Sequence, residues 1–136
     1  AALCDIDTEK AKKVAERFGC DAPIFSDFRA MLDEIAPDTV HVCTPHYLHA
    51  EMVIELLERN INVLCEKPLA MKMEDCQAIV DAAKKSNKKF MVGQVCRFTP
   101  ALVKAKELIS SGKIGELVFV ESEYAHCYEK SRGKDD

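Results

Sequence analysis

The stretches Thr39-Val40-His41-Val42-Cys43-Thr44-Pro45 and Ile61-Asn62-Val63-Leu64-Cys65-Glu66-Lys67-Pro68 decide the fold. Each is a short apolar run that stops at a polar residue and a proline, which is typical of a buried strand and the turn after it. The segment between them carries apolar residues at helical spacing and closes at Asn60. A strand, a helix and a second strand with short connections predict two neighbouring strands of a parallel sheet.

The same alternation continues on both sides of this unit. Upstream, residues 1–4 resemble a buried strand, a helix over 8–18 ends at Gly19, and a second helix over 28–35 starts at Asp27 and stops before Pro37. Downstream, a helix around residues 76–83 precedes a short apolar run over 90–93. The sequence therefore predicts an α/β fold with a doubly wound parallel sheet, entered after its first strand and helix.

The pattern changes near residue 97. Thr99-Pro100 starts a helix that ends at Gly112, and residues 117–125 alternate in the manner of a strand with one wet face. We expect one domain over residues 1–97 and the start of a second α/β domain over 98–136. The polar tail over 129–136 is expected to be poorly ordered.

Composition excludes several classes of function. The 136 residues carry a net charge of −4 without a long basic run, so neither nucleic acid nor a membrane surface is an expected partner. The seven cysteines form an odd set without CxxC spacing, which disfavours a disulfide framework or a zinc site. We expect free thiols, with Cys4, Cys43 and Cys65 buried at strand ends, in a cytoplasmic protein.

Polar residues follow each predicted strand. Ligands of open parallel sheets bind outside the carboxyl ends of the strands, so these residues are expected to form the site. They are Asp5, then Thr44-Pro45-His46, then Glu66-Lys67-Pro68, then the run from Gln94 to Arg97.

Asp5 and Lys67 are the two residues with the clearest chemistry. An acidic residue at the end of the second strand of a nucleotide-binding unit accepts hydrogen bonds from ribose hydroxyls and repels a 2′-phosphate, so Asp5 favours NAD over NADP. Asp5 or Asp7 could instead cap the next helix. Lys67 could bind a substrate hydroxyl and assist proton transfer, or pair with Glu66 as a surface lysine.

The histidines and Arg97 carry weaker signals. His46 and His49 lie three residues apart at the start of a helix and can share a face, but no third metal ligand accompanies them, so capping or cofactor contact is expected. Arg97 lies at the expected junction of the two domains, where it could contact a ligand or pair with a carboxylate.

Several motifs, in this order and spacing, closely resemble the Gfo/Idh/MocA oxidoreductase family over residues 1–125. They are Cys4-Asp5-Ile6-Asp7, Thr44-Pro45-His46-Tyr47-Leu48-His49, Glu66-Lys67-Pro68-Leu69-Ala70, and Arg97-Phe98-Thr99-Pro100 followed by Ser111-Gly112-Lys113-Ile114-Gly115.

The resemblance implies a Rossmann-type dinucleotide-binding domain and a second α/β domain that acts on sugars, polyols or cyclitols. It places Asp5 at the adenosine ribose, Glu66 near the nicotinamide ribose and Lys67 in the catalytic site. It also implies that Thr44, Pro45 and His49 line the dinucleotide, while residue 46 is often Asn in the family. We add His46, Lys67 and Arg97 as cofactor contacts, and expect no metal and a homo-oligomeric parent protein.

The resemblance also implies parts that these residues do not supply. The glycine-rich turn and the acid–base partner of the lysine are expected before residue 1 and after residue 136, so the chain alone should neither hold NAD well nor turn over.

The expected reaction is hydride transfer between a secondary alcohol carbon and the nicotinamide. Two other activities remain compatible with the same residues: a glycosidase that oxidises its substrate transiently with bound NAD, and a non-catalytic dinucleotide-binding regulator. A remnant that is stable only beside the rest of its polypeptide is a further possibility.

Overall fold

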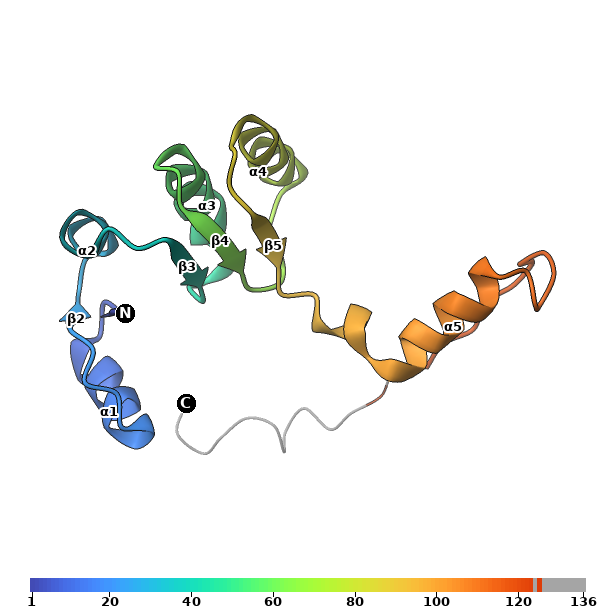
Figure 1. Cartoon of the computed structure of the whole chain (residues 1–136), viewed down its shortest axis with the longest axis horizontal. Coiled ribbons are helices and arrows are strands. Elements are labelled where there is room, and N and C mark those ends of the chain that lie inside the picture. The colour runs from blue at the N-terminus through green and yellow to red at the C-terminus, as the bar shows by residue number, and fades with distance from the viewer. Residues whose placement is uncertain (124, 126–136) are drawn as a thin grey trace. The chain divides into compact units, whose positions relative to one another are not determined.

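The computed structural model describes residues 1–123 and residue 125. It divides into two compact units, Ala1–Gln94 and Val95–Asp136, which are described separately below. The first unit alternates strands and helices along its whole length (Figure 1). Its elements are β1 (Leu3–Cys4), α1 (Thr8–Phe18), β2 (Ile24–Phe25), α2 (Phe28–Ile35), β3 (Thr39–Val42), the 3₁₀ turn η1 (His46–Leu48), α3 (His49–Glu58), β4 (Asn62–Cys65), α4 (Met73–Lys85) and β5 (Phe90–Val92).

All strand pairs among the described residues are parallel, as predicted. β1 pairs with β2 in one sheet, and the second sheet has the order β3-β4-β5. In the second sheet Val42 lies beside Cys65, and Cys65 lies beside Val92. The three carboxyl ends of these strands therefore share one edge. The strand β2 was not predicted, because a run of two residues is too short to show any periodicity.

The predicted helix ends are confirmed by their capping contacts. The Asp7 carboxylate accepts a hydrogen bond from the Lys10 backbone N–H at 3.0 Å at the start of α1. Asp27 accepts one from the Ala30 N–H at 2.8 Å at the start of α2. α1 ends at Gly19, whose φ of 61° is a left-handed conformation that glycine adopts without steric cost.

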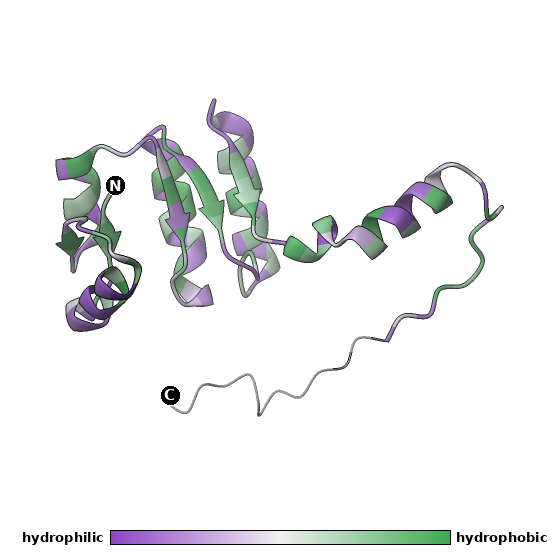
Figure 2. Cartoon of the chain, turned by 60° about the horizontal axis from the view of Figure 1, so that its bottom comes forward, coloured by the Kyte–Doolittle hydropathy of each residue, from purple (hydrophilic) through white to green (hydrophobic). Residues whose placement is uncertain are grey.

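The hydrophobic core lies between the β3-β4-β5 sheet and the helices α3 and α4 (Figure 1), and it also includes Met31 and Leu32 of α2. In Figure 2 the helices carry both green and purple residues, as expected for helices that bury one face and expose the other. Alternate residues of each strand point toward the helices. The fully buried side chains of this core include Val42, Val53, Leu56, Cys65 and Ile79.

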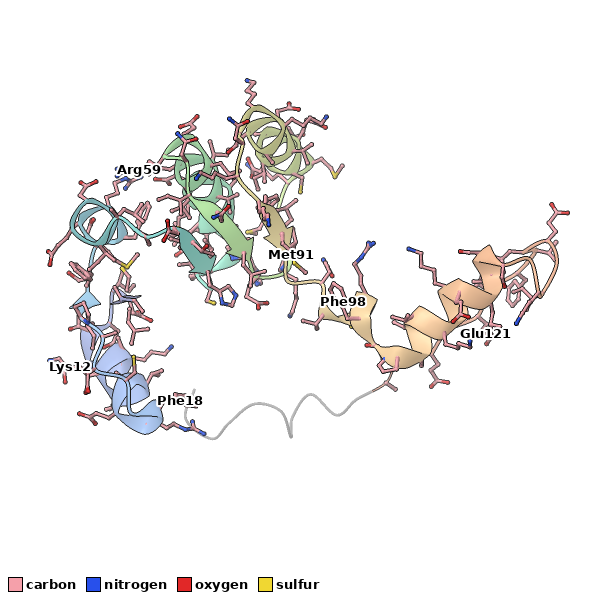
Figure 3. The ribbon with its side chains drawn as sticks, in the orientation of Figure 1. Lys12, Phe18, Arg59, Met91, Phe98 and Glu121 are labelled. Atoms are coloured by element: carbon pink, nitrogen blue, oxygen red, sulfur yellow. The ribbon has the colours of Figure 1, made fainter. Side chains whose placement is uncertain are left out.

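The intervening strand residues point to the opposite face of the sheet. They include His41 on β3, Leu64 on β4 and Met91 on β5, which lie beside one another in the register. Met91 is 47% exposed and its side chain is labelled in Figure 3. This face of the sheet therefore carries a histidine close to the strand ends.

Charged side chains connect α2 to α3. Arg29 bonds Glu51 at 2.7 Å and Glu55 at 2.8 Å. Arg59, labelled in Figure 3, pairs with Asp33 on α2 and with Glu55 at 3.0 Å. These pairs fix the helix before β3 against the helix after it.

The second unit contains η2 (Val95–Phe98) and α5 (Pro100–Ser110). The helix predicted after Thr99 is confirmed, with Pro100 as its first residue. The strand predicted over 117–125 is wrong for residues 117–123, which belong to no helix or strand. A strand needs a neighbour for its backbone groups, and the described residues offer none at this position. The tail over 129–136 lies outside the described residues.

Among the helices that the structure describes, none is both long and apolar enough to cross a membrane.

Candidate functional site

Three polar loops follow the carboxyl ends of β3, β4 and β5. They begin at Cys43, Glu66 and Gly93, and backbone hydrogen bonds continue the sheet into them. The Glu66 N–H donates to Val42 at 2.9 Å, and the Gly93 N–H donates to Cys65 at 2.7 Å. The loops are therefore held side by side at the edge where parallel sheets bind ligands.

The Glu66 side chain lies between the other two strands. Its Oε1 is 3.6 Å from His41 Nε2, and its Oε2 accepts a hydrogen bond from the Lys67 backbone N–H at 3.3 Å. A Cβ at Gly93 would lie 3.2 Å from Oε1, a distance tighter than most such contacts. The absence of a side chain at Gly93 thus leaves the room in which the Glu66 carboxylate sits.

Sequence reasoning missed His41 and Gly93 as members of this site. His41 lies between Val40, which is partly buried, and Val42, which is buried, so its direction toward the other face was available from the period of two. Gly93 directly follows β5, where a glycine often marks a close approach. Neither signal indicates by itself that the partner is Glu66.

Lys67 is exposed at this edge. Its ammonium makes no hydrogen bond or ion pair with any residue that the structure describes, and its only tie to Glu66 is through the backbone N–H. The alternative of a surface ion pair between the two side chains is therefore not what the structure contains. The following Lys67–Pro68 peptide bond is cis.

Two cysteines adjoin Glu66. Burial, and then the charges of Glu66 and Cys43, raise the pKa of the Cys65 thiol to about 11. Burial and Glu66 also raise the pKa of Cys43. Cys65 is buried as expected, whereas Cys43 and Cys4 are exposed, because only Cys65 points into the core under α3. All six cysteines that the structure describes are free.

His46 and His49 lie next to each other with their rings in an edge-to-face arrangement, 5.8 Å between centroids. His46 is exposed at the start of η1, whereas His49 is completely buried at the start of α3. The two ring nitrogens of His49 each lie 2.9 Å from a carbonyl oxygen, one of Pro68 and one of Thr44. In the described part of the chain, no three His, Cys, Asp or Glu residues are grouped as metal ligands.

Thr44 and Pro45 form the loop between β3 and η1. The Thr44 hydroxyl contacts the Met52 sulfur at 3.4 Å, and the Pro45 carbonyl accepts a hydrogen bond from the Leu48 N–H at 2.9 Å. His49 therefore brings this loop together with the loop that carries Glu66 and Lys67.

Asp5 follows β1 in the other sheet. Its Oδ1 accepts a hydrogen bond from the Asp7 N–H at 2.9 Å. The N-cap of α1 is Asp7 and not Asp5. Asp5 therefore does not have the capping role that was the alternative to ribose binding. Arg97 lies in η2, in the second unit, so its expected contact with a cofactor stays a prediction.

The described residues fit part of a dinucleotide. Asp5 offers a carboxylate oxygen to ribose hydroxyls, and the loops after β3, β4 and β5 offer polar groups at one sheet edge. The sequence contains no G-x-G-x-x-G pattern, the backbone cradle that holds a pyrophosphate. The fit therefore covers the ribose and nicotinamide parts.

Comparisons with known proteins agree with this geometry. The profile of the Gfo/Idh/MocA family, described as an oxidoreductase family with an NAD-binding Rossmann fold, matches residues 1–94. A levoglucosan dehydrogenase from Pseudarthrobacter phenanthrenivorans is 36% identical over 122 residues, covering 90% of this chain and 31% of that protein. A 2,7-anhydro-N-acetylneuraminate hydratase from Escherichia coli is 34% identical, covering 96% of this chain and 32% of that protein.

A solved structure of levoglucosan dehydrogenase in complex with NADH and levoglucosan superposes with a TM-score of 0.76. It is 37% identical, over 84% of this chain and 31% of that one. The chain thus spans about a third of the length of the curated relatives it matches.

Proposed function

The chain belongs to the Gfo/Idh/MocA oxidoreductase family and carries most of its NAD-binding Rossmann fold, and on that premise we propose that the complete protein is an NAD-dependent dehydrogenase of sugars or polyols. The reaction is hydride transfer between a secondary alcohol carbon of the substrate and C4 of the nicotinamide.

The position of Lys67 is the observation that carries this proposal. Its ammonium is exposed at the carboxyl edge of the parallel sheet, and no carboxylate among the described residues neutralises it. A cation in this place can donate a hydrogen bond to a substrate hydroxyl and stabilise negative charge on that oxygen as its proton leaves. Lys67 is therefore the proposed catalytic residue.

The oxidation balances with one two-electron acceptor. NAD, when bound, supplies the acceptor for the hydride that leaves the alcohol carbon. The alcohol becomes a carbonyl compound, and its hydroxyl proton is released through a base to solvent. Lys67 holds the oxygen during this step, so this chain contributes mainly orientation and electrostatics.

The same edge supplies the proposed cofactor contacts. Glu66 binds near the nicotinamide ribose, and Thr44, Pro45 and His46 line the dinucleotide. Asp5 accepts hydrogen bonds from the adenosine ribose, and its negative charge disfavours the 2′-phosphate of NADP. Arg97 is a further proposed cofactor contact. We place a dinucleotide domain at residues 1–97, with Arg97 as its last residue, and the start of a second domain at residues 98–136.

The substrate class is proposed from the relatives. Matched proteins are named for levoglucosan, for inositol and for a D-glucoside, all of which carry several secondary hydroxyls. We propose a cytoplasmic homo-oligomer that acts on such a sugar, polyol or cyclitol, in a compartment that keeps its free thiols reduced.

Turnover by the complete protein tests the proposal. NADH and NADPH are titrated by fluorescence, and a panel of sugars, cyclitols and other polyols is then screened for NADH formation from NAD. The expected result is tighter binding of NADH and net reduction with one class of alcohol. Failure to bind either dinucleotide would overturn the proposal.

A reaction without net oxidation is the second candidate. Relatives that are 34% and 35% identical are named hydratases, not dehydrogenases. The same edge could oxidise a substrate transiently and return the hydride, as in a redox-assisted glycosidase or hydratase. Product formation with bound NAD and no accumulation of NADH would favour this candidate, whereas binding without any product would favour a regulator.

A further inference from the structure

His49 occupies an unusual position at the proposed site. Its side chain is completely buried, yet it is polar and sits at the first residue of α3. Nδ1 lies 2.9 Å from the Pro68 carbonyl oxygen, and Nε2 lies 2.9 Å from the Thr44 carbonyl oxygen. Both partners belong to loops at the carboxyl edge of the sheet.

The two carbonyl partners restrict the hydrogen bonds that the His49 ring can make. A backbone carbonyl only accepts hydrogen bonds, and a neutral imidazole has one N–H. The ring is therefore held between the two loops, and the tautomer decides which carbonyl accepts its hydrogen bond. No other partner of the ring nitrogens is present among the described residues, and no buried side-chain polar atom there is left without one.

The ring is also fixed in place. His49 is the first residue of a helix that places Val53 and Leu56 in the core with 0% exposure. The Pro68 carbonyl follows Lys67 directly in the chain, and the Thr44 carbonyl lies at the loop that begins after β3. A displacement of either loop would break one of the two contacts.

We propose that His49 is a positioning residue whose buried ring, with one nitrogen 2.9 Å from each carbonyl, holds the Thr44 loop beside the Lys67-Pro68 loop, and so fixes Lys67 relative to the dinucleotide-binding loop. This inference rests on the proposed function of Lys67. It replaces a direct contact of His49 with the dinucleotide, because the buried ring has both nitrogens occupied.

Two substitutions separate the two contacts. The amide nitrogen of Asn occupies approximately the place of Nδ1, and that of Gln approximately the place of Nε2. His49→Gln therefore keeps a donor for Thr44 and loses the bond to Pro68, whereas His49→Asn does the reverse. His49→Phe fills the volume and removes both bonds.

The variants are made in the complete protein, with Ile79→Val as a control for general loss of core packing. Ile79 is fully buried on α4 and contributes to neither loop. Hydrogen exchange is measured at the backbone N–H groups of residues 44–48 and 66–70, in which Pro45 and Pro68 have none. We expect His49→Phe to accelerate exchange in both segments. His49→Gln should accelerate exchange mainly in residues 66–70, and His49→Asn mainly in residues 44–48. Ile79→Val should not accelerate exchange selectively in either segment.

Kinetics and NMR give the second readout. His49→Gln should lower kcat by roughly tenfold to a hundredfold with little change in NADH affinity, since small misplacements of a catalytic group have effects of this size. His49→Asn should weaken NADH binding more than it lowers kcat. The ¹⁵N spectrum of the native protein should show a His49 ring N–H that is protected from exchange with solvent, as expected for a buried, hydrogen-bonded ring.

A His49 ring N–H that exchanges freely with solvent, or a folded His49→Phe variant with native loop exchange, would overturn the inference. Exchange and NMR do not depend on turnover. If the complete protein bound no dinucleotide but the loops responded as described, the proposed function would fail while the connection made by His49 would stand.

Discussion

The room beside Gly93 determines where the Glu66 carboxylate can lie. Gly93→Ala would place a methyl group 3.2 Å from Glu66 Oε1, so the carboxylate or the loop must shift by a few tenths of an ångström. We expect NADH binding to the complete protein to weaken by about three- to tenfold, a loss below about 1.4 kcal/mol, with the fold retained. Fluorescence titration measures the change.

A double-mutant cycle gives the control for this prediction. Glu66→Asp shortens the side chain and relieves the new contact, so it should be less harmful in the Gly93→Ala background than in the native protein. Equal effects in both backgrounds would contradict the contact between these residues.

Cys65 should be the least reactive of the described thiols. Its pKa is raised to about 11, first by burial and then by Glu66 and Cys43, so at pH 8 it holds its proton and cannot act as a thiolate. Iodoacetamide should modify the exposed Cys20 and Cys96 well before Cys65, as peptide mass spectrometry of the folded protein would show. Equally fast modification of Cys65 would be inconsistent with its burial.

The same shift has a consequence for stability. Because the folded-state pKa lies above the ordinary value of 9.0, the unfolded chain loses this proton first as the pH rises. The stability that the neutral thiol contributes is complete below pH 9 and is lost as the pH rises through about 11.

At the scale of elements, the ion pairs between α2 and α3 should stabilise α2, the helix that precedes β3. Arg29→Met removes contacts to Glu51 and Glu55, and we expect a lower urea midpoint for the complete protein. Exposed pairs are screened by salt, so the loss should shrink at high ionic strength. Lys12→Met, which removes only an exposed pair within α1, should have a smaller effect. If Arg29→Met and Lys12→Met lowered the urea midpoint equally, the ion pairs between α2 and α3 would not contribute specifically to stability.

The buried side chains of α3 should contribute much more to the free energy of unfolding than the side chains on its exposed face. Leu56 is 0% exposed, and Leu56→Ala should lower the free energy of unfolding by about 2–5 kcal/mol. Glu58→Ala, on the exposed side of the same helix, should stay within about 0.5 kcal/mol. Chemical denaturation distinguishes the two, and similar losses would mean that the core lies elsewhere.

The elements differ in how far sequence could predict them. β3, α3 and β4 were predictable because their apolar periods are long enough to distinguish strand from helix. β2 was not, since pairing with β1 and not its own two residues makes it a strand. Residues 117–123 have the alternation of a strand but no partner among the described residues, and alternation alone does not supply one.

At the scale of the whole molecule, the parallel sheet accounts for most of the site. The rule that ligands bind at the carboxyl ends of strands selects Thr44, Glu66 and Lys67 by their positions in the sequence alone. The pairings of Glu66 with His41 and of His49 with two carbonyls depend on side-chain packing across elements, which no local pattern encodes.

The most direct test of the role of Lys67 compares native and Lys67→Met forms of the complete protein in a single turnover with NAD and a substrate alcohol. We expect NADH formation in the variant to fall by at least about a hundredfold while the dissociation constant for NADH changes little, because Lys67 acts on the substrate hydroxyl. A variant that forms NADH at the native rate, or one that loses NADH binding and turnover in equal measure, would contradict the assignment of Lys67 as the catalytic residue.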